Sequence, residues 1–340
     1  MDSDLRIRVL IVDDSPFVRK ALLRIFESEP SFTVVGVARN GKEAIEKALS
    51  LKPDVVTLDI VMPVLDGIET LKILMERYPV PVLMLSQFTH EGADLTLRAL
   101  QLGAMDFVDK SSRGLMDFLA LASEIVTKAK AIAHNKPKTI SCEPKVLSGY
   151  STRGVVDVVA IGASTGGPPA LGMILQKFPK DIGFGVLIVQ HMPKGFTATL
   201  AERFNGMCAI CVKEAKDRDR IEPGVALIAP SGIHMKVRKG GGSVALDEEP
   251  ANLIHRPSVD VLFQSVAENY GSRSMGVILT GMGSDGAKGL KSIKEKGALT
   301  LAQDEATSVI FGMPRVAINS GVVDKVVPLT EVAEEIMKNA

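Results

Sequence analysis

Apolar runs of strand length alternate with amphipathic segments of helical period through the first 133 residues. The strand-like runs cover residues 7–14, 34–38, 54–60, 81–86 and 106–110. Between them the pattern predicts a first helix that Ser15 caps and Pro16 begins, and further helices near residues 42–49, 67–77, 93–100 and 116–133. This alternation is typical of a parallel sheet with helices on both faces.

The same alternation returns from residue 155. Strands are predicted in VVDVVAIGAS, GVLIVQH and MGVILT, helices in PPALGMILQKF, after Ser258 and from Ala287, and a β-hairpin over residues 234–249. Residues 134–154 are rich in Lys, Pro, Ser, Thr and Gly and lack an apolar period, which favours a linker. We therefore predict two α/β domains, residues 5–133 and 155–340, each a mainly parallel sheet covered by helices.

Charge and hydropathy argue against nucleic-acid-binding, membrane-spanning and secreted proteins. Lys plus Arg equals Asp plus Glu at 40 each, and no long basic run occurs, so the sequence does not favour a nucleic-acid binder. The sequence contains no run of about 18 apolar residues, the length that a membrane-spanning helix needs. The first ten residues lack the basic and apolar regions of a secretion signal. We expect a cytoplasmic protein that does not insert into membranes.

The cysteines do not predict a disulfide framework or a metal site. Cys208 and Cys211 form a C-x-x-C motif, and Cys142 is the only other cysteine. We expect both residues of the motif in one short strand, where positions three apart point to opposite faces. Without a second ligand pair, a metal or redox role is not favoured.

Polar side chains stand at the ends of the strands predicted for the first domain. Asp13 and Asp14 follow the first strand, Asp59 ends the third, Ser86 the fourth and Lys110 the fifth. The carboxyl ends of parallel strands meet at one edge of a sheet, so these side chains should converge. A divalent cation such as Mg²⁺ relieves the repulsion between carboxylates. The alternative is that each is a solvated strand end.

The motifs VDDSP, LDIVMPVLDG, LSQ and FVDKS resemble the receiver domains of two-component response regulators over residues 5–130. The resemblance implies a flavodoxin-like fold with Asp59 as the phosphoacceptor. It also implies a Mg²⁺ site in which Asp14 and Asp59 are ligands, Asp13 helps, and the Val61 carbonyl is a further ligand.

The resemblance also assigns the residues that respond to phosphorylation. Ser86 and Lys110 would bind the oxygens and the charge of the phosphoryl group, and Phe107 stands where the family has its aromatic switch residue. One position departs from the family, which usually has Pro after the lysine. Here Ser111 follows Lys110, so the loop after the fifth strand is expected to differ in shape.

In the second domain, GASTG at residues 162–166 fits G-x-S-x-G with a strand before it and a helix after it. The glycines permit a sharp turn that lifts Ser164 above the sheet at a helix N-terminus. By itself the motif fits a nucleophile and a phosphate- or dinucleotide-binding turn equally well.

Two further residues favour a nucleophile. His191 directly follows the strand GVLIVQ, and Asp285 lies in the loop after MGVILT, so both can meet Ser164 at one rim. A serine hydroxyl needs an adjacent base, and a carboxylate can fix the tautomer of an imidazole. His255 is the main rival for the base, and a His191 that only caps its strand is the structural alternative.

The chain order Ser, His, Asp differs from that of ordinary α/β-hydrolases, so a different fold is expected to carry this chemistry. GASTGG, VQHMP, ILTGMGSDGAKGL and AQDEATSVIFGMP, with the receiver in front, resemble the chemotaxis protein-glutamate methylesterases over essentially the whole chain. The resemblance implies a Rossmann-like catalytic domain. It further implies hydrolysis of glutamate γ-methyl esters on chemoreceptors, with release of methanol, and deamidation of receptor glutamines.

The resemblance carries a mechanism and its regulation. Ser164 attacks the side-chain carbonyl, His191 transfers the proton and Asp285 orients the imidazole. The oxyanion is expected to bind the backbone N–H of Thr165 at the turn and, from the resemblance, that of Met282. The family implies that the unphosphorylated receiver hinders access and that the chemotaxis histidine kinase supplies the phosphate. No cofactor is expected at the hydrolase site.

Two alternatives from other classes remain open at the level of sequence. A receiver-controlled nucleotide-binding protein would use the glycine-rich turn, although GASTGG lacks the G-x-G-x-x-G spacing. A non-catalytic docking protein would keep the fold without turnover.

Overall fold

The computed structural model describes residues 6–87, 89–110, 121–135, 137, 146–147 and 155–340. The chain divides into two compact units, Met1–Thr139 and Ile140–Ala340. Ser111 and most of the predicted linker 134–154 lie outside the described residues. The predicted domain limits therefore stay predictions.

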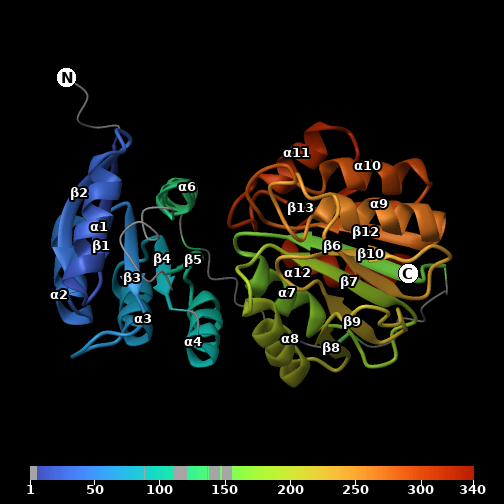
Figure 1. Ribbon diagram of the computed structural model, residues 1–340, viewed down its shortest axis with the longest axis horizontal. Coiled ribbons are helices and arrows are strands. Elements are labelled where there is room, and N and C mark those ends of the chain that lie inside the picture. Colours follow the sequence, from blue (N-terminus) through green and yellow to red (C-terminus); the bar gives the residue numbers. More distant parts are fainter. Residues whose placement is uncertain (1–5, 88, 111–120, 136, 138–145, 148–154) are drawn as a thin grey trace. The chain divides into compact units, whose positions relative to one another are not determined.

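The first unit is a five-stranded parallel sheet in the order β2-β1-β3-β4-β5, which confirms the predicted flavodoxin-like fold (Figure 1). Helix α1 packs beside α6, whereas α2, α3 and α4 pack in succession. The strands are β1 Ile7–Val12, β2 Phe32–Ala38, β3 Val55–Asp59, β4 Val82–Ser86 and β5 Asp106–Asp109. The helices are α1 Pro16–Glu27, α2 Gly41–Leu51, α3 Gly67–Arg77, α4 His90–Gln101 and α6 Ala122–Ala133.

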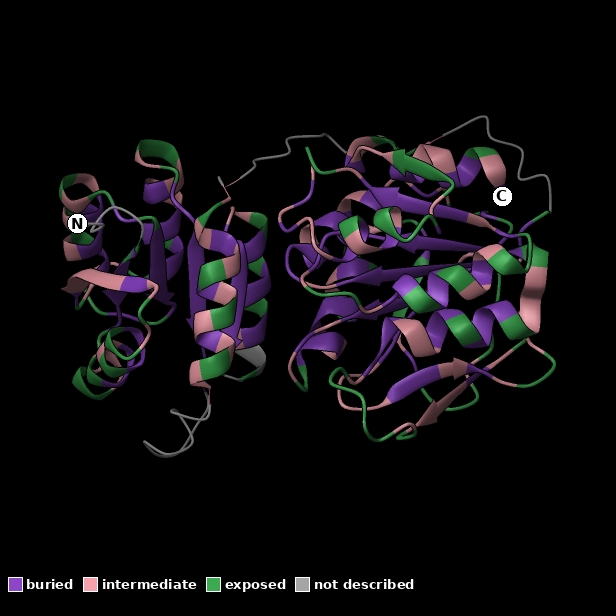
Figure 2. Ribbon diagram, turned by 90° about the horizontal axis from the view of Figure 1, so that it is seen from above, coloured by how far each residue is buried: buried purple, intermediate pink, exposed green. Residues whose placement is uncertain are grey.

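Short polar side chains determine where these helices begin. The Ser15 hydroxyl accepts the Val18 N–H before α1, and the Asp66 carboxylate accepts the Glu69 N–H before α3. Each cap satisfies one of the backbone donors that a helix leaves unpaired at its N-terminus. Each of these helices has one buried side and one exposed side (Figure 2).

The second unit is a seven-stranded parallel sheet in the order β14-β13-β12-β6-β7-β9-β8, with a separate antiparallel hairpin β10-β11. This confirms the predicted Rossmann-like sheet and hairpin. The strands are β6 Val158–Ala163, β7 Gly185–Gln190, β8 Cys211–Glu214, β9 Val225–Ile228, β10 His234–Val237, β11 Val244–Asp247, β12 Ser274–Ile278, β13 Leu299–Gln303 and β14 Lys325–Val327.

Helices cover both faces of this sheet. In Figure 1, α9, α10 and α11 lie over one face and α7, α8 and α12 over the other. No described helix has the length and apolar character needed to cross a membrane. The helices are α7 Gly167–Leu175, α8 Phe196–Met207, α9 Val259–Tyr270, α10 Ala287–Glu295, α11 Met313–Asn319 and α12 Leu329–Asn339, with a 3₁₀ turn η1 at Gly271–Arg273.

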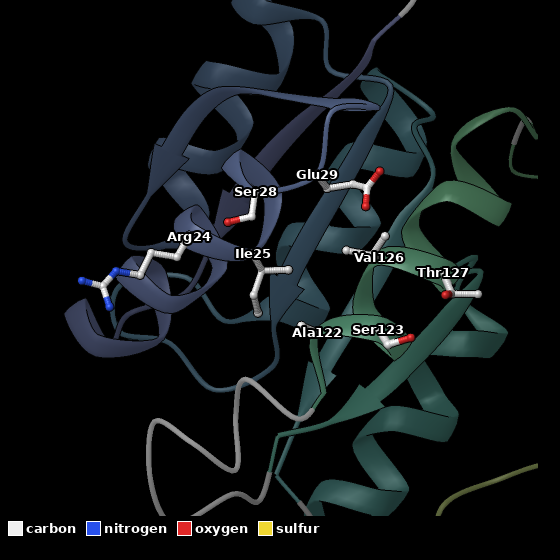
Figure 3. Close-up of a pocket in the computed structure, with 8 residues that line it drawn as sticks. All are labelled: Arg24, Ile25, Ser28, Glu29, Ala122, Ser123, Val126 and Thr127. Atoms are coloured by element: carbon white, nitrogen blue, oxygen red, sulfur yellow. The ribbon is translucent and has the colours of Figure 1, made fainter.

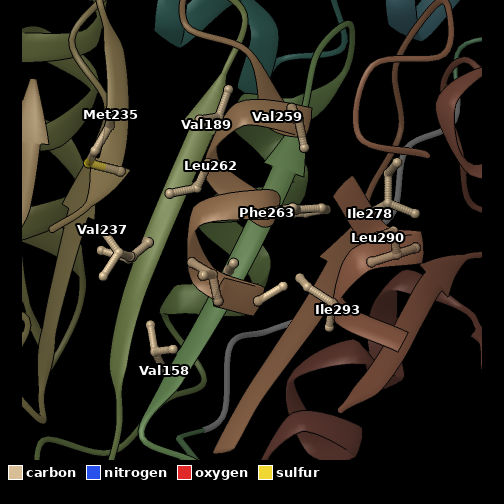
Figure 4. Close-up of a cluster of buried hydrophobic side chains, with 14 of the residues drawn as sticks. Val158, Val189, Met235, Val237, Val259, Leu262, Phe263, Ile278, Leu290 and Ile293 are labelled. Atoms are coloured by element: carbon tan, nitrogen blue, oxygen red, sulfur yellow. The ribbon is translucent and has the colours of Figure 1, made fainter. Parts of the chain in front are cut away.

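Helix α9 is fixed by a continuous apolar core (Figure 4). Leu262 and Phe263 are fully buried against the sheet, and Met235 and Val237 of the hairpin pack into the same cluster. Removal of a buried aromatic side chain such as Phe263 typically costs about 3–5 kcal/mol. The core therefore holds the N-terminus of α9 in one place, which matters for the site below.

The prediction for the C-x-x-C motif was wrong for Cys208. The helical pattern of α8 continues to Met207, and the Cys208 N–H donates to the Phe204 carbonyl, so Cys208 ends the helix and β8 begins only at Cys211. Burial raises the pKa of the Cys208 thiol to about 11. A thiol that stays protonated near neutral pH is a poor nucleophile and metal ligand.

Candidate active site and acidic cluster

Asp13, Asp59 and Lys110 meet in the first unit. Lys110 Nζ lies 2.7 Å from one carboxylate oxygen of Asp13 and 2.7 Å from one of Asp59, and all three side chains are buried. Oxygens of Asp13, Asp14 and Asp59 lie within 4.8 Å of one another. Burial raises the pKa of Asp59 to about 6; Asp13 adds repulsion, and Lys110 favours the charged form. Three hard oxygen donors with one cation nearby form a site that could bind a metal ion.

The remaining predicted residues of this cluster lie on the neighbouring strands. Ser86 ends β4 and pairs in register with Asp109, next to the Leu85 that pairs with Asp59. The Ser86 hydroxyl accepts a hydrogen bond from Thr96 at 2.7 Å. Phe107 is buried on β5, and Val61 follows β3 with its side chain exposed.

A pocket of about 870 Å³ opens elsewhere in this unit, between α1 and α6 (Figure 3). None of its residues belongs to the acidic cluster. The pocket is lined by Arg24, Ile25, Ser28, Glu29, Ala122, Ser123, Val126 and Thr127.

Strand register brings Ser164 and His191 together in the second unit. Ala163, the last residue of β6, pairs with Gln190, the last residue of β7, and Ser164 and His191 directly follow the two strands. The His191 N–H donates to the Ala163 carbonyl at 3.1 Å. Neighbouring strands are about 4.8 Å apart, so the two side chains start from adjacent positions at the same sheet edge.

The turn after β6 has the geometry that the motif predicts. Gly166 has a φ of +78°, and a Cβ there would lie 2.5 Å from Val309 Cβ, so only glycine fits. Helix α7 begins at the next residue, and the Gly167 N–H donates to the Ser164 carbonyl at 2.8 Å. Ser164 thus stands at the positive end of α7.

The loop after β12 lies directly beside Ser164. The Ser164 N–H donates to the Thr280 carbonyl at 3.0 Å, and a Cβ on Gly281 would lie 2.8 Å from Ser164 Cβ. The Thr280 hydroxyl donates to the Thr165 carbonyl at 2.9 Å. Met282 is the next residue of this loop. The two predicted oxyanion donors, Thr165 and Met282, therefore both belong to backbone adjoining Ser164.

His191 and Asp285 form a direct pair. His191 Nε2 lies 2.9 Å from Asp285 Oδ2. The Asp285 carboxylate also accepts the Ser258 hydroxyl at 2.8 Å, the Val259 N–H at 2.7 Å and the Asp260 N–H at 3.0 Å. Burial opposes ionisation of Asp285, but these donors and the His191 imidazole outweigh it and lower its pKa to about 2.

The ionised Asp285 determines the tautomer of His191. A carboxylate only accepts hydrogen bonds, so the proton on the neutral ring is on Nε2. The other nitrogen, Nδ1, is buried and has no hydrogen-bond partner among the described residues. It is therefore the atom that can accept a proton, and no hydrogen bond joins it to Ser164 in this structure.

Models of two known protein families match this chain. A family model described as CheB methylesterase matches residues 159–336, and one described as response regulator receiver domain matches residues 9–117. The chain belongs to the CheB methylesterase family.

Relatives of this methylesterase match along its whole length. A protein-glutamate methylesterase/protein-glutamine glutaminase of Archaeoglobus fulgidus is 48% identical over 97% of both chains. One of Halalkalibacterium halodurans is 46% identical over 98% of both chains. The crystal structure of the Thermotoga maritima CheB methylesterase catalytic domain matches with a TM-score of 0.52 and 39% identity, over 54% of this chain and 99% of that one. The nucleotide-binding and non-catalytic alternatives are not favoured.

The candidate active site also contains residues that the sequence patterns did not indicate. The side-chain amide of Gln190 donates to the main-chain carbonyls of Ser164 and His191, at 2.9 and 3.0 Å. Ser258 was predicted only as a helix cap, but it also binds Asp285. Adjacency to the strand end was the only signal for Gln190, and nothing in the sequence connected Ser258 to Asp285.

His255, the predicted rival for the base, stacks on His191 with ring centroids 4.2 Å apart and an angle of 14° between the planes. Burial and the neighbouring His191 lower the pKa of His255. The two rings are thus in face-to-face contact, and the pairing with Asp285 belongs to His191.

Proposed function

We propose that this member of the CheB methylesterase family hydrolyses glutamate γ-methyl esters on chemoreceptors and deamidates receptor glutamines to glutamate. The observation that carries the proposal is the His191–Asp285 pair. His191 follows the strand next to that of Ser164, and its Nδ1 has no hydrogen-bond partner among the described residues. The names of the full-length relatives support the substrate class.

In the proposed reaction, the Ser164 hydroxyl attacks the side-chain carbonyl while His191 Nδ1 takes its proton. The imidazolium then gives this proton to the leaving methanol or ammonia, which leaves an acyl-enzyme. Water repeats the attack, with His191 again as the base, and the product is a glutamate carboxylate with Ser164 restored. Asp285 keeps the proton on Nε2 and stabilises the imidazolium.

The negative charge that develops on the carbonyl oxygen requires preorganised donors. We assign this role to the backbone N–H groups of Thr165, the residue after Ser164, and of Met282, the residue after the Gly281 that lies against Ser164. One such donor is typically worth about 3–4 kcal/mol of barrier. The N-terminal end of α7 adds a favourable partial charge at the same place.

Phosphorylation of Asp59 by a chemotaxis histidine kinase is the proposed control. Lys110 would pair with the phosphoryl charge, and the Ser86 hydroxyl would bind its oxygens. Phe107 on the neighbouring strand would respond to this rearrangement. The donor set fits Mg²⁺, which would be held by Asp13, Asp14 and Asp59 with the Val61 carbonyl. When bound, the ion neutralises the clustered negative charge.

Methanol release from methylated receptor membranes, with and without a small-molecule phosphodonor, tests the proposal. The wild-type protein should release methanol faster with the phosphodonor. Ser164→Ala should abolish release while Asp59 still becomes phosphorylated, and Asp59→Asn should lose only the stimulation. Methanol release by Ser164→Ala at the wild-type rate would contradict the nucleophile assignment.

A further inference from the structure

His234 is a fully buried histidine that the proposed reaction does not use. It begins strand β10, and both of its ring nitrogens are engaged. Nδ1 accepts the Ser258 N–H at 3.1 Å, and Nε2 lies 3.3 Å from the Pro250 carbonyl. A backbone N–H only donates and a carbonyl only accepts, so the ring is neutral with its proton on Nε2.

The Ser258 backbone that His234 binds leads directly to Asp285. Ser258 caps α9 and donates its hydroxyl to Asp285, and the next two backbone N–H groups, of Val259 and Asp260, donate to the same carboxylate. Among the described residues, three of the four hydrogen bonds to the Asp285 carboxylate therefore come from the segment that begins at Ser258. The fourth comes from His191.

We propose that His234 is a positioning residue for the hydrolase: its Nδ1 fixes the Ser258 backbone and thereby holds Asp285 on His191. The inference deepens the proposed function and rests on it. Among the described residues, His234 makes no hydrogen bond to Ser164 or to His191. His234 therefore acts on Asp285 by fixing the N-terminus of α9. The apolar core holds the same helix through Val259 and Leu262.

The chemistry of the contact explains why a histidine stands there. A buried N–H without an acceptor costs about 1–3 kcal/mol, so Ser258 requires an acceptor at this point. Burial lowers the pKa of His234, and the nearby Arg256 and Lys236 act in the same direction, while the Pro250 carbonyl and Asp285 oppose them. The ring thus keeps the lone pair that accepts the Ser258 N–H.

Two substitutions in the full-length protein separate this role from simple packing. His234→Leu fills a similar volume but offers no acceptor, whereas Asn in His234→Asn can place its side-chain oxygen near the position of Nδ1. We expect His234→Leu to lower kcat for methanol release about 10- to 100-fold with little change in KM. His234→Asn should recover most of that loss.

Ile336→Ala is the control, since Ile336 is also fully buried but lies on α12, over the face of the sheet opposite α9. It should lower the melting temperature at least as much as His234→Leu but leave kcat within about twofold. Proton NMR gives a second readout, because the His191 Nε2–H bonded to Asp285 should give a low-field resonance. That signal should shift or disappear in His234→Leu and stay in Ile336→Ala.

A His234→Leu protein with wild-type kcat and an unchanged low-field resonance would overturn the inference, as would equal loss of kcat in His234→Leu, His234→Asn and Ile336→Ala. Failure of the proposed function is distinguishable from this. In that case the wild-type protein itself would release no methanol, while the NMR comparison would still measure whether His234 holds the His191–Asp285 pair.

Discussion

Asp260 and Asp285 cap each other's helices. Asp285, just before α10, accepts the Val259 and Asp260 N–H groups at the start of α9. Asp260, in the first turn of α9, accepts the Gly286 and Gly289 N–H groups at the start of α10, at 2.9 and 2.7 Å. Each carboxylate therefore lies at the positive end of the other's helix, and the arrangement holds Asp285 from both sides.

Removal of the Asp260 carboxylate should loosen this arrangement. We expect Asp260→Ala to lower the free energy of unfolding by about 1–2 kcal/mol and to reduce kcat as well. Asp260→Asn keeps an oxygen acceptor and should be milder in both. Asp324→Ala is a control that removes a carboxylate bound to Thr300, and it should affect stability alone. Urea unfolding and methanol release measure the two effects, and unchanged kcat in Asp260→Ala would contradict the coupling.

The Asp285 carboxylate also predicts a pH dependence of stability. Its pKa is lowered to about 2 in the folded protein from an ordinary 3.8. The stabilisation, about 2 kcal/mol, is therefore complete well above pH 3.8 and is lost as the pH falls towards 2. About 1 kcal/mol should be lost by pH 3. The difference in unfolding free energy between the wild type and Asp285→Asn should narrow accordingly between pH 6 and pH 3, and a constant difference would contradict the assignment.

The stack of His255 on His191 separates the two candidates for the base. If His191 is the base, His255→Phe keeps an aromatic ring on the imidazole and should retain most of the activity, and His255→Ala should cost about tenfold at most. Removal of a general base typically costs about 100- to 10,000-fold. A loss of that size in His255→Phe, measured as kcat for methanol release, would transfer the role to His255.

Gln190 should influence the spacing of nucleophile and base. Its amide nitrogen bridges the Ser164 and His191 carbonyls, so Gln190→Met should leave both without this donor and reduce kcat about tenfold. Gln176→Met is the matched control, because the Gln176 amide donates to the Gly172 carbonyl on α7. Equal kcat in the two variants would show that the bridge has no role in turnover.

Mg²⁺ should stabilise the first unit through its acidic cluster. At a concentration 100 times its Kd, a bound ion adds about 2.7 kcal/mol to the unfolding free energy. Because the pKa of Asp59 is raised to about 6, protons compete with the ion below that pH. The increase in melting temperature should be larger at pH 7.5 than at pH 5.5 and should be reduced in Asp59→Asn. The exposed Asp54→Asn is the control, and an equal loss of the increase in that variant would contradict the site.

The fold followed from the apolar pattern because buried parallel strands and their helices leave a strong periodic signal. Short edge elements were not predicted: β14, Lys325–Val327, is only three residues long and largely exposed. Cys208 was misplaced because the helix continues further than its local composition indicates.

The candidate sites were predictable where they depend on strand ends. Asp13, Asp59 and Lys110 could be brought together by topology alone, and so could Ser164 and His191. The contacts of His234 and Asp260 could not, because they depend on how α9 packs against the hairpin and α10. The pattern of apolar and polar residues within one element does not predict how that element packs against another.

His191 binds Asp285 through the outer nitrogen of its ring and keeps the inner one free. Nδ1 is one covalent bond closer to the Cα than Nε2, so a given rotation of the side chain displaces it less. Nδ1, the proton-accepting atom, therefore stays close to the backbone at the end of β7. Nε2, which binds Asp285, moves further and follows any displacement of α9 and α10. A reagent that alkylates the free nitrogen should accordingly modify Nδ1, and the methylated isomer of histidine recovered after digestion would identify it.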